Sequence, residues 1–278
     1  MGGLDPDGSV ISDVELIDLS GRGLECQRPS GPPSVGWGYS SLKTQEGNPL
    51  VCGGEITVPN TIDGLTHCFN YDPINDAWEA GAETINERFF SPTAEISQGK
   101  YMILGEGFRL STSEPLHYDF NTEIYQNGIF TLGPDLPEPF TFFLQRPCAA
   151  KISEDKTFYS DGYTSMIYDW SSSSWTNPRG LDYSRIVQCG YARKANGDEM
   201  IVVVGEHGDH TQVLDLFNNE WRFLEKTHAP FWSAYGERVQ MEDTFLLTGG
   251  LTHPNTTRNI IEFAPDEEKW IVRKEEMS

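Results

Sequence analysis

Residues 71–78 read Tyr71-Asp72-Pro73-Ile74-Asn75-Asp76-Ala77-Trp78, a large apolar residue followed by Asp, with an aromatic residue seven positions after the first. The same offset recurs along the chain, and in most copies Asp again follows the first residue. The copies are Ile17-Asp18 with Leu24, Tyr71-Asp72 with Trp78, Tyr118-Asp119 with Tyr125, Tyr168-Asp169 with Trp175, Leu214-Asp215 with Trp221, and Phe263 with Trp270. Successive copies begin 54, 47, 50, 46 and 49 residues apart. A period of about 50 residues predicts one structural unit repeated along the chain.

The chemistry of the repeat explains its parts. An Asp side chain hydrogen-bonds to backbone N–H groups two residues further on, so Asp72 and its counterparts start a turn between two strands. The returning strand carries the aromatic residue. We expect each Trp to pack as a wedge between neighbouring repeats, where its large ring buries apolar area. Stacking on a ligand is the alternative role.

A second element precedes each copy: a short apolar strand that ends at a glycine-containing turn. These strands span 49–54, 101–105, 157–162, 201–205 and 245–250, and two of them end in the pairs Gly53-Gly54 and Gly249-Gly250. Apolar runs of this length favour buried strands, and glycine permits backbone angles that other residues avoid. Further candidate strands lie at 90–96, 148–152, 187–193 and 232–240. The sequence therefore predicts an all-β protein with four strands per repeat.

The composition agrees with many short strands joined by turns. The 278 residues include 27 Gly and 17 Pro, and 12% are aromatic. With 20 Lys and Arg against 42 Asp and Glu, the formal net charge of −22 repels nucleic acid and anionic membranes. We expect a protein partner that carries a basic patch; solubility alone is the other interpretation. No apolar run is long enough for a membrane helix, and residues 1–7 do not resemble a signal peptide.

Taken together, the apolar strand, the Gly-Gly pair, the variable loop and the Tyr-Asp pair with its later Trp resemble the kelch repeat over nearly the entire chain. An Arg ahead of the inner strand, at Arg88 and Arg185, adds to the likeness. The match is imperfect, because Glu follows Gly105 and Gly205 and because Asp161 replaces the first glycine. The resemblance implies a kelch-type β-propeller, usually of six blades, whose innermost strands line a central channel.

We label the strands of each blade a to d, from the innermost outwards. The sequence then holds five complete blades and an N-terminal c–d hairpin, at 14–18 and 24–26, without an a–b pair of its own. We expect a six-bladed propeller whose last blade is incomplete in this chain. A closed five-bladed ring with an extra hairpin is the alternative. Residues 1–12 are predicted to be a disordered segment, and 13–278 to form a single propeller domain.

No catalytic motif occurs in the sequence, and no catalytic, cofactor-binding or metal-binding residue is predicted from it. The segment 207–210, His-Gly-Asp-His, offers two imidazoles and a carboxylate. Polar residues are nevertheless ordinary in a loop after a strand end. None of the five cysteines has the C-x-x-C spacing that would indicate zinc.

Two cysteine pairs are candidates for disulfide bonds. Cys52 and Cys68 flank the b–c loop of one blade, and Cys148 and Cys189 fall in the inner strands of adjacent blades. Buried free thiols are the alternative. Cysteines at these places resemble those of divergent extracellular kelch proteins, which slightly favours secretion, and residues 255–257 form a glycosylation sequon. The compartment itself stays open.

A propeller presents recognition residues on loops at one face of a rigid scaffold. Aromatic residues gather in two connecting segments, at Phe140, Phe142 and Phe143, and at Trp232 and Tyr235. They are candidate anchors for a protein partner; burial in the core is the other interpretation. The sequence thus favours a non-enzymatic protein–protein interaction scaffold. The alternative is an enzyme acting on a small molecule or carbohydrate in the central channel.

Overall fold

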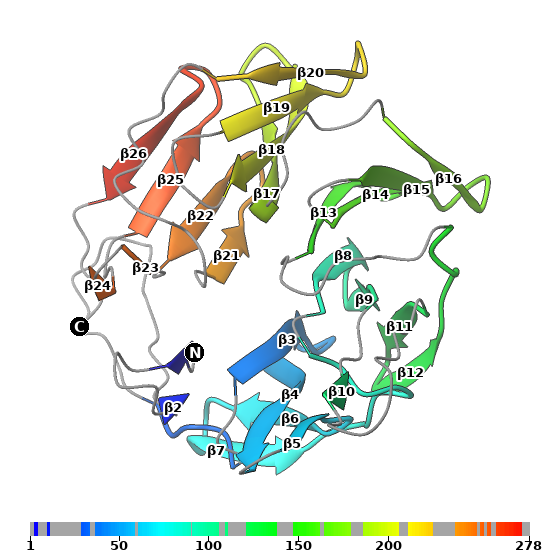
Figure 1. The fold of residues 1–278 in the computed structure, drawn as a ribbon, viewed down its shortest axis with the longest axis vertical. Helices are drawn as coiled ribbons and strands as arrows, with labels where there is room; N and C mark the ends of the chain where they lie inside the picture. The colour runs from blue at the N-terminus through cyan, green and yellow to red at the C-terminus, as the bar shows by residue number, and fades with distance from the viewer. Residues whose placement is uncertain are drawn as a thin grey trace. The chain divides into compact units, whose positions relative to one another are not determined.

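The computed structural model describes residues 3–4, 10–11, 29–33, 37–58, 61–89, 91–105, 109–110, 121–137, 147–161, 164–178, 186–205, 211–224, 237–248, 251–252, 255–256 and 260–273. Every regular element among these residues is a β-strand (Figure 1), so the all-β prediction is confirmed. The described residues hold no helix that could cross a membrane. The chain divides into two compact units, 1–141 and 142–278. The single domain expected over 13–278 stays a prediction.

Five four-stranded antiparallel blades account for most of the strands, two in unit 1 and three in unit 2. In unit 1, blade 1 consists of β3 (Trp37–Lys43), β4 (Pro49–Val58), β6 (Cys68–Asp72) and β7 (Ala77–Ala80), and blade 2 of β8 (Thr93–Ser97), β9 (Lys100–Ile103), β11 (Glu123–Gln126) and β12 (Ile129–Leu132). In unit 2, blade 3 consists of β13 (Cys148–Ser153), β14 (Lys156–Ser160), β15 (Ser165–Asp169) and β16 (Ser174–Thr176), blade 4 of β17 (Ile186–Arg193), β18 (Glu199–Gly205), β19 (Thr211–Asp215) and β20 (Glu220–Phe223), and blade 5 of β21 (Glu237–Gln240), β22 (Phe245–Thr248), β25 (Ile260–Ala264) and β26 (Lys269–Arg273). The strands of each blade pair in chain order, which confirms the predicted a-to-d arrangement.

Short strand pairs occupy some of the connections. β5 (Thr61–Gly64) pairs with the second half of β4 and with β10 (Arg109–Leu110), and β23 (Leu251–Thr252) pairs with β24 (Asn255–Thr256). Near the N-terminus, β1 (Gly3–Leu4) pairs with β2 (Val10–Ile11), inside the segment 1–12 that the sequence predicted to be disordered. The predicted N-terminal hairpin at 14–18 and 24–26 lies outside the described residues.

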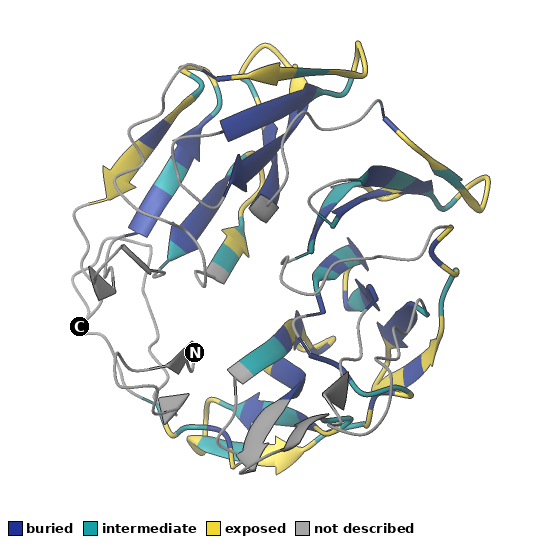
Figure 2. Cartoon of the chain, in the orientation of Figure 1, coloured by how far each residue is buried: buried dark blue, intermediate teal, exposed yellow. Residues whose placement is uncertain are grey.

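Burial is concentrated in the middle strands of the blades, as Figure 2 shows for β14, β18 and β22, whereas the outer strands β16, β20 and β26 are mostly exposed. The run Ile201-Val202-Val203-Val204 is buried on both faces because neighbouring blades cover both. Such a strand reads as a continuous apolar run rather than an alternating one. This is why the b strands stood out in the sequence.

The repeated motif forms the c–d hairpin of four blades. Its two ends are cross-strand neighbours in each: Tyr71 with Trp78, Tyr168 with Trp175, Leu214 with Trp221, and Phe263 with Trp270. The last residue of each turn has a positive φ, namely 49° at Asp76, 52° at Ser173, 57° at Asn219 and 51° at Glu268. The constant offset of seven therefore reports one turn geometry that is repeated in both units.

Blade 2 departs from this register, and the sequence placed its copy wrongly. Tyr125 lies on the c strand β11, where it pairs with Phe130 on β12; it does not lie on the d strand. Asn127 and Gly128, with φ of 53° and 77°, form a two-residue turn, and Asn-Gly favours the tight hairpin whose two central residues both have positive φ. Tyr118 and Asp119 lie outside the described residues. Tyr125 thus takes the place that Tyr71 has in blade 1.

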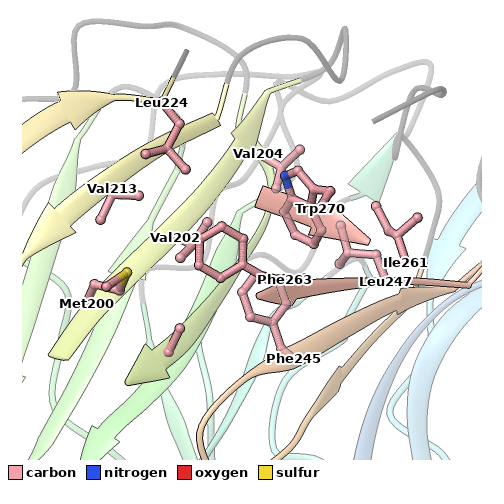
Figure 3. Close-up of a cluster of buried hydrophobic side chains, with 11 residues drawn as sticks. Met200, Val202, Val204, Val213, Leu224, Phe245, Leu247, Ile261, Phe263 and Trp270 are labelled. Carbon is pink, nitrogen blue, oxygen red and sulfur yellow. The ribbon is translucent and has the colours of Figure 1, made fainter. Parts of the chain in front are cut away.

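The predicted aromatic wedge is present between blades 4 and 5. Trp270 is 9% exposed, meets the rings of Phe245 and Phe263 edge-on at 5.4 and 5.3 Å, and donates from Nε1 to Thr211 Oγ1 at 3.0 Å. Figure 3 shows it in one apolar cluster with blade 4 side chains, among them Val204. Trp221 packs in the same way against blade 3, with its ring 6.2 Å from that of Phe158. Trp221 and Trp270 are therefore structural.

Candidate functional site

The aromatic residues that the sequence offered as anchors lie outside the residues that the structure describes. These are Phe140, Phe142, Phe143, Trp232 and Tyr235. Outside them also lie the loop 207–210, Arg185 and the pair Gly249-Gly250. All of these remain predictions. The described geometry concerns the strands, the turns that join a to b and c to d, and the segment that connects blade 1 to blade 2.

The Gly53-Gly54 pair holds the segment that connects blade 1 to blade 2. A Cβ on Gly53, whose φ is 74°, would stand 2.2 Å from the carbonyl oxygen of Arg88, and the N–H of Gly54 donates to that oxygen at 2.8 Å. Only glycine permits this approach at this backbone angle. The pair is therefore a packing device rather than part of a ligand site.

Arg88 and Glu123 form a fully buried ion pair behind this contact. Nη2 and Nε of Arg88 lie 2.5 and 3.1 Å from Glu123 Oε1, and Nη1 donates to the carbonyl oxygens of Gly105 and Asn121 at 2.9 and 3.1 Å. The Glu123 carboxylate also accepts the N–H groups of residues 85–86 at 2.8 and 2.9 Å. Because the two charged groups bind one another and the backbone, the network ties two blades together and satisfies its own charges.

Both candidate cysteine pairs are disulfide-bonded in the structure. Cys52 and Cys68 are direct cross-strand neighbours on β4 and β6, with Cα atoms 4.0 Å apart. Cys148 and Cys189 join the a strands of blades 3 and 4, with Cα atoms 5.7 Å apart. The first bond fastens one blade, and the second fastens two neighbouring blades to each other.

Arg238, on the a strand of blade 5, contacts the a strands of blades 3 and 4 next to this second disulfide bond. Its Nη1 donates to the carbonyl oxygens of Ala149 and Cys189 at 2.7 and 3.2 Å. The a strands of blades 3, 4 and 5 are thus linked by one side chain and one disulfide bond. This linkage makes the inner part of unit 2 rigid.

The pKa values of two tyrosine side chains are raised by burial and by hydrogen bonds to carboxylates of the same blade. Burial, with a hydrogen bond to Glu199 at 2.6 Å, raises the pKa of Tyr191. Burial and the hydrogen bond to Asp76 raise the pKa of Tyr71 to about 12. Both phenols are therefore held neutral by their own surroundings. In the part of the chain that is described, no three His, Cys, Asp or Glu side chains group together as metal ligands would.

Phe217 has the greatest exposure of any large apolar side chain among the described residues, at 94%, and lies at the tip of the β19–β20 turn. Asp215 Oδ1 accepts the N–H groups of Phe217 and Asn218 at 2.9 and 3.0 Å, and the Asn218 amide donates to Oδ2 at 3.0 Å. Hydrogen bonds, that from the Asn218 backbone foremost, lower the pKa of Asp215. The carboxylate therefore stays charged at neutral pH and holds the backbone of Phe217 in place.

This turn is fastened to its neighbours. The N–H of Leu216 donates to the carbonyl oxygen of Glu199 at 3.1 Å, which connects the c–d turn to the start of β18. The N–H of Ala195, in the a–b turn of the same blade, donates to Asp266 of blade 5 at 2.9 Å. We refer to the two turns of blade 4, residues 194–199 and 215–220, as the Phe217 surface.

Glu268 of blade 5 engages two cations, Lys194 within this surface and Arg222 beside it. Its Oε1 lies 2.6 Å from Lys194 Nζ and 2.5 Å from Arg222 Nη2, and its Oε2 accepts from Arg222 Nη1 at 2.7 Å. Burial raises the pKa of Glu268, but the hydrogen bonds from Arg222 and Lys194 outweigh it and leave the pKa below its ordinary value. The acids that stay exposed on the Phe217 surface are Asp198, Glu199 and Glu220.

The sequence interpretation missed Phe217, although a signal was present. The motif predicts a turn, and the residue three positions after the first residue of the motif lies at the tip of that turn. That position holds Ile74, Ser171 and Asp266 in other blades and Phe217 in blade 4. A turn tip is solvated, so a phenylalanine there is an unusual choice.

The likeness of this chain to known proteins lies in its fold. No protein-family model matches the chain, and no curated protein matches it. The solved structure of YjhT is similar, with a TM-score of 0.74 and 11% sequence identity, covering 95% of this chain and 91% of that one. A likeness at this identity shows the fold alone. The chain has the β-propeller fold, with five four-stranded blades among the residues described.

Proposed function

We propose that this chain is a divergent kelch-repeat propeller that acts as a non-enzymatic protein–protein interaction scaffold. The observation that carries the proposal is Phe217, an aromatic side chain 94% exposed on a turn whose backbone is fixed by hydrogen bonds. Residues that gain the most from burial by a partner are large, aromatic and held in place before binding.

The free energy at stake is large enough to matter for binding. Moving a fully exposed Phe side chain out of water contributes roughly 1.5 to 3 kcal/mol. Because Asp215 already orders the turn, little of that gain is lost to fixing the backbone on association. The Phe217 side chain is not buried in the core of this chain, so a partner can bury it.

The rest of the molecule supports a scaffold role. The Trp270 wedge and the disulfide bond between Cys148 and Cys189 hold the blades of unit 2 against each other. With a net charge of −22, we expect a partner with a basic patch and an association that weakens as salt rises. The two disulfide bonds support a place in an oxidising compartment, such as the extracellular space.

Affinity capture from an extract of the source organism, with quantitative mass spectrometry, tests the proposal. An unrelated folded protein of similar size and net charge serves as the control bait and removes proteins held by charge alone. We expect at least one protein to be enriched over the control bait at physiological salt. Capture of nothing above the control, together with a stoichiometric metal ion in the purified chain, would refute the scaffold and favour a channel enzyme.

A further inference from the structure

We propose that the Phe217 surface docks a partner segment with an apolar socket bordered by Lys and Arg side chains. Phe217 enters the socket, and the partner's cations meet Asp198, Glu199 and Glu220. The inference rests on the proposed function and deepens it, because it names the site and the chemistry of the partner. It also moves the binding site from the loops that the sequence favoured to the turns that join a to b and c to d.

The first step is the geometry of the anchor. Phe217 projects from a four-residue turn with its Asp215 carboxylate beneath it, and Leu216 next to it is bonded to the backbone at Glu199. The turn of blade 1 has the same design and presents Ile74 at 90% exposure. There, Ser30 is bonded to Asp76 and Trp78, so the chain's own segment lies against the end of the turn and leaves Ile74 exposed. The turn of blade 4 has Phe217 at its tip.

The second step is the charge around the anchor. Asp198, Glu199 and Glu220 are exposed. The cations Lys194 and Arg222 are both engaged by Glu268, which accepts three close contacts from them. The single Glu268 carboxylate balances only one of these two cations. Asp215 and the three exposed acids outnumber the positive charge that remains, so the surface has a negative field. A binding partner must supply the opposite charge.

The third step is the choice of occupant. A second copy of this chain carries the same acids and would meet them with like charge, and an anionic membrane or a nucleic acid is repelled for the same reason. An apolar partner without cations would leave the acids facing apolar surface, which costs free energy. A protein segment that combines Lys or Arg with apolar residues satisfies both requirements.

Selection of peptides from a random dodecapeptide phage library on the immobilised full chain tests the inference. We expect enriched peptides to combine Lys or Arg with aromatic or aliphatic residues. Synthetic copies of these peptides are then titrated against purified variants by biolayer interferometry. The Phe217→Ala change should weaken binding about 10-fold or more, the range of a binding hot spot.

Matched variants give the inference its controls. Ile74→Ala removes an equally exposed apolar residue from an equivalent turn, and should leave the peptide affinity unchanged. Glu220→Lys should weaken binding, and the loss should shrink as salt rises because the charges are then screened. Unchanged melting temperatures show that each variant is folded.

The outcomes separate the two proposals. Peptides that bind Phe217→Ala and Glu220→Lys as tightly as the wild type overturn the docking site but leave the scaffold function standing. Enrichment of acidic or neutral peptides, or of none, overturns the basic partner. Capture of a partner from the extract remains an independent test of the scaffold itself.

Discussion

Both the junction of blades 1 and 2 and that of blades 4 and 5 contain a cluster of buried apolar side chains. The first junction adds a fully buried ion pair, whereas the second adds the Trp270 wedge and has its charges at the rim. In the first junction Arg88 and Glu123 are both 0% exposed. In the second, Trp270 fills the interface, and the pair of Arg222 and Glu268 is 43% and 22% exposed. The two junctions thus share an apolar cluster and differ in the polar or aromatic groups that are added to it.

The difference has consequences for stability. Two buried charges must first lose their water, and their attraction offsets that loss only while both partners are present. A wedge of apolar area depends on no single partner, and an ion pair at the rim contributes little because water screens it. We therefore expect the first junction to fail abruptly when one residue is changed, and the rim of the second to tolerate change.

The largest effect is expected for Glu123→Gln, which removes the charge and keeps the shape. The change leaves the Arg88 guanidinium buried without its counter-charge and should lower the free energy of unfolding by about 3 to 5 kcal/mol. Urea denaturation followed by Trp fluorescence measures it.

The control for this variant is the double change Arg88→Met with Glu123→Gln. Because the uncompensated cation is then gone as well, the double variant should be more stable than Glu123→Gln alone. A loss below about 1 kcal/mol for the single variant, as at an exposed pair, would show that the two junctions do not differ in the way described.

The junction between blades 3 and 4 adds a covalent tie. Replacing Cys148 and Cys189 together by Ala should cost about 2 to 4 kcal/mol, because the open chain gains conformational freedom when unfolded. The pair of Cys52 and Cys68 is the matched control. It closes 16 residues rather than 41, so its double-Ala variant should lose about 1 kcal/mol less. Thermal unfolding of both variants measures the two losses of stability. A larger loss for the Cys52 and Cys68 variant would contradict the entropic explanation.

Sequence reasoning recovered the parts of this comparison that have a local pattern. Trp270 was predicted to be a wedge because it recurs seven residues after an apolar residue, and the b strands because they are continuous apolar runs. Glu123 carried no such signal, since a carboxylate at a strand start looks like any exposed acid until the fold brings it to Arg88. Its partner lies 35 residues away, and no local rule reaches that far.

The error in blade 2 has a different cause. The offset of seven was extended to Tyr118 and Tyr125, although Asn127-Gly128 follows at once and is a strong signal for a two-residue hairpin. The turn chemistry outweighs the periodicity, and the c strand moves to Tyr125. Phe217 was missed because the search for anchors favoured clusters of aromatic residues over a single one at a turn tip.

At the rim of the second junction, Glu268→Gln tests how little a surface pair contributes. The change weakens the contacts with Lys194 and Arg222 and should lower the free energy of unfolding by less than about 1 kcal/mol. The loss should fade at high salt. Glu267→Gln, next to it and exposed, should have no effect. A loss as large as that of Glu123→Gln would remove the distinction between buried and rim charge.

The smallest effect on stability is expected when the pH is lowered, and it arises in the c–d turn of blade 3. Hydrogen bonds from the Ser171 side chain and then the Ser172 backbone lower the pKa of Asp169 to about 2, against 3.8 in an unfolded chain. Between these values the unfolded chain binds the proton more readily. The stabilisation is therefore complete above the ordinary pKa and is lost as the pH falls towards about 2.

Asp169→Asn keeps the accepting oxygen but cannot titrate. Its melting temperature should fall less than that of the wild type when the pH is lowered from about 5 to about 2.5, and circular dichroism measures the difference. Equal falls would mean that the hydrogen-bonded carboxylate adds no acid sensitivity of its own. Asp72 and Asp215 hold the same position and have lowered pKa values in unit 1 and unit 2. Acid should therefore loosen the turns of blades 1, 3 and 4 alike, because these three blades share the Asp at the start of the turn.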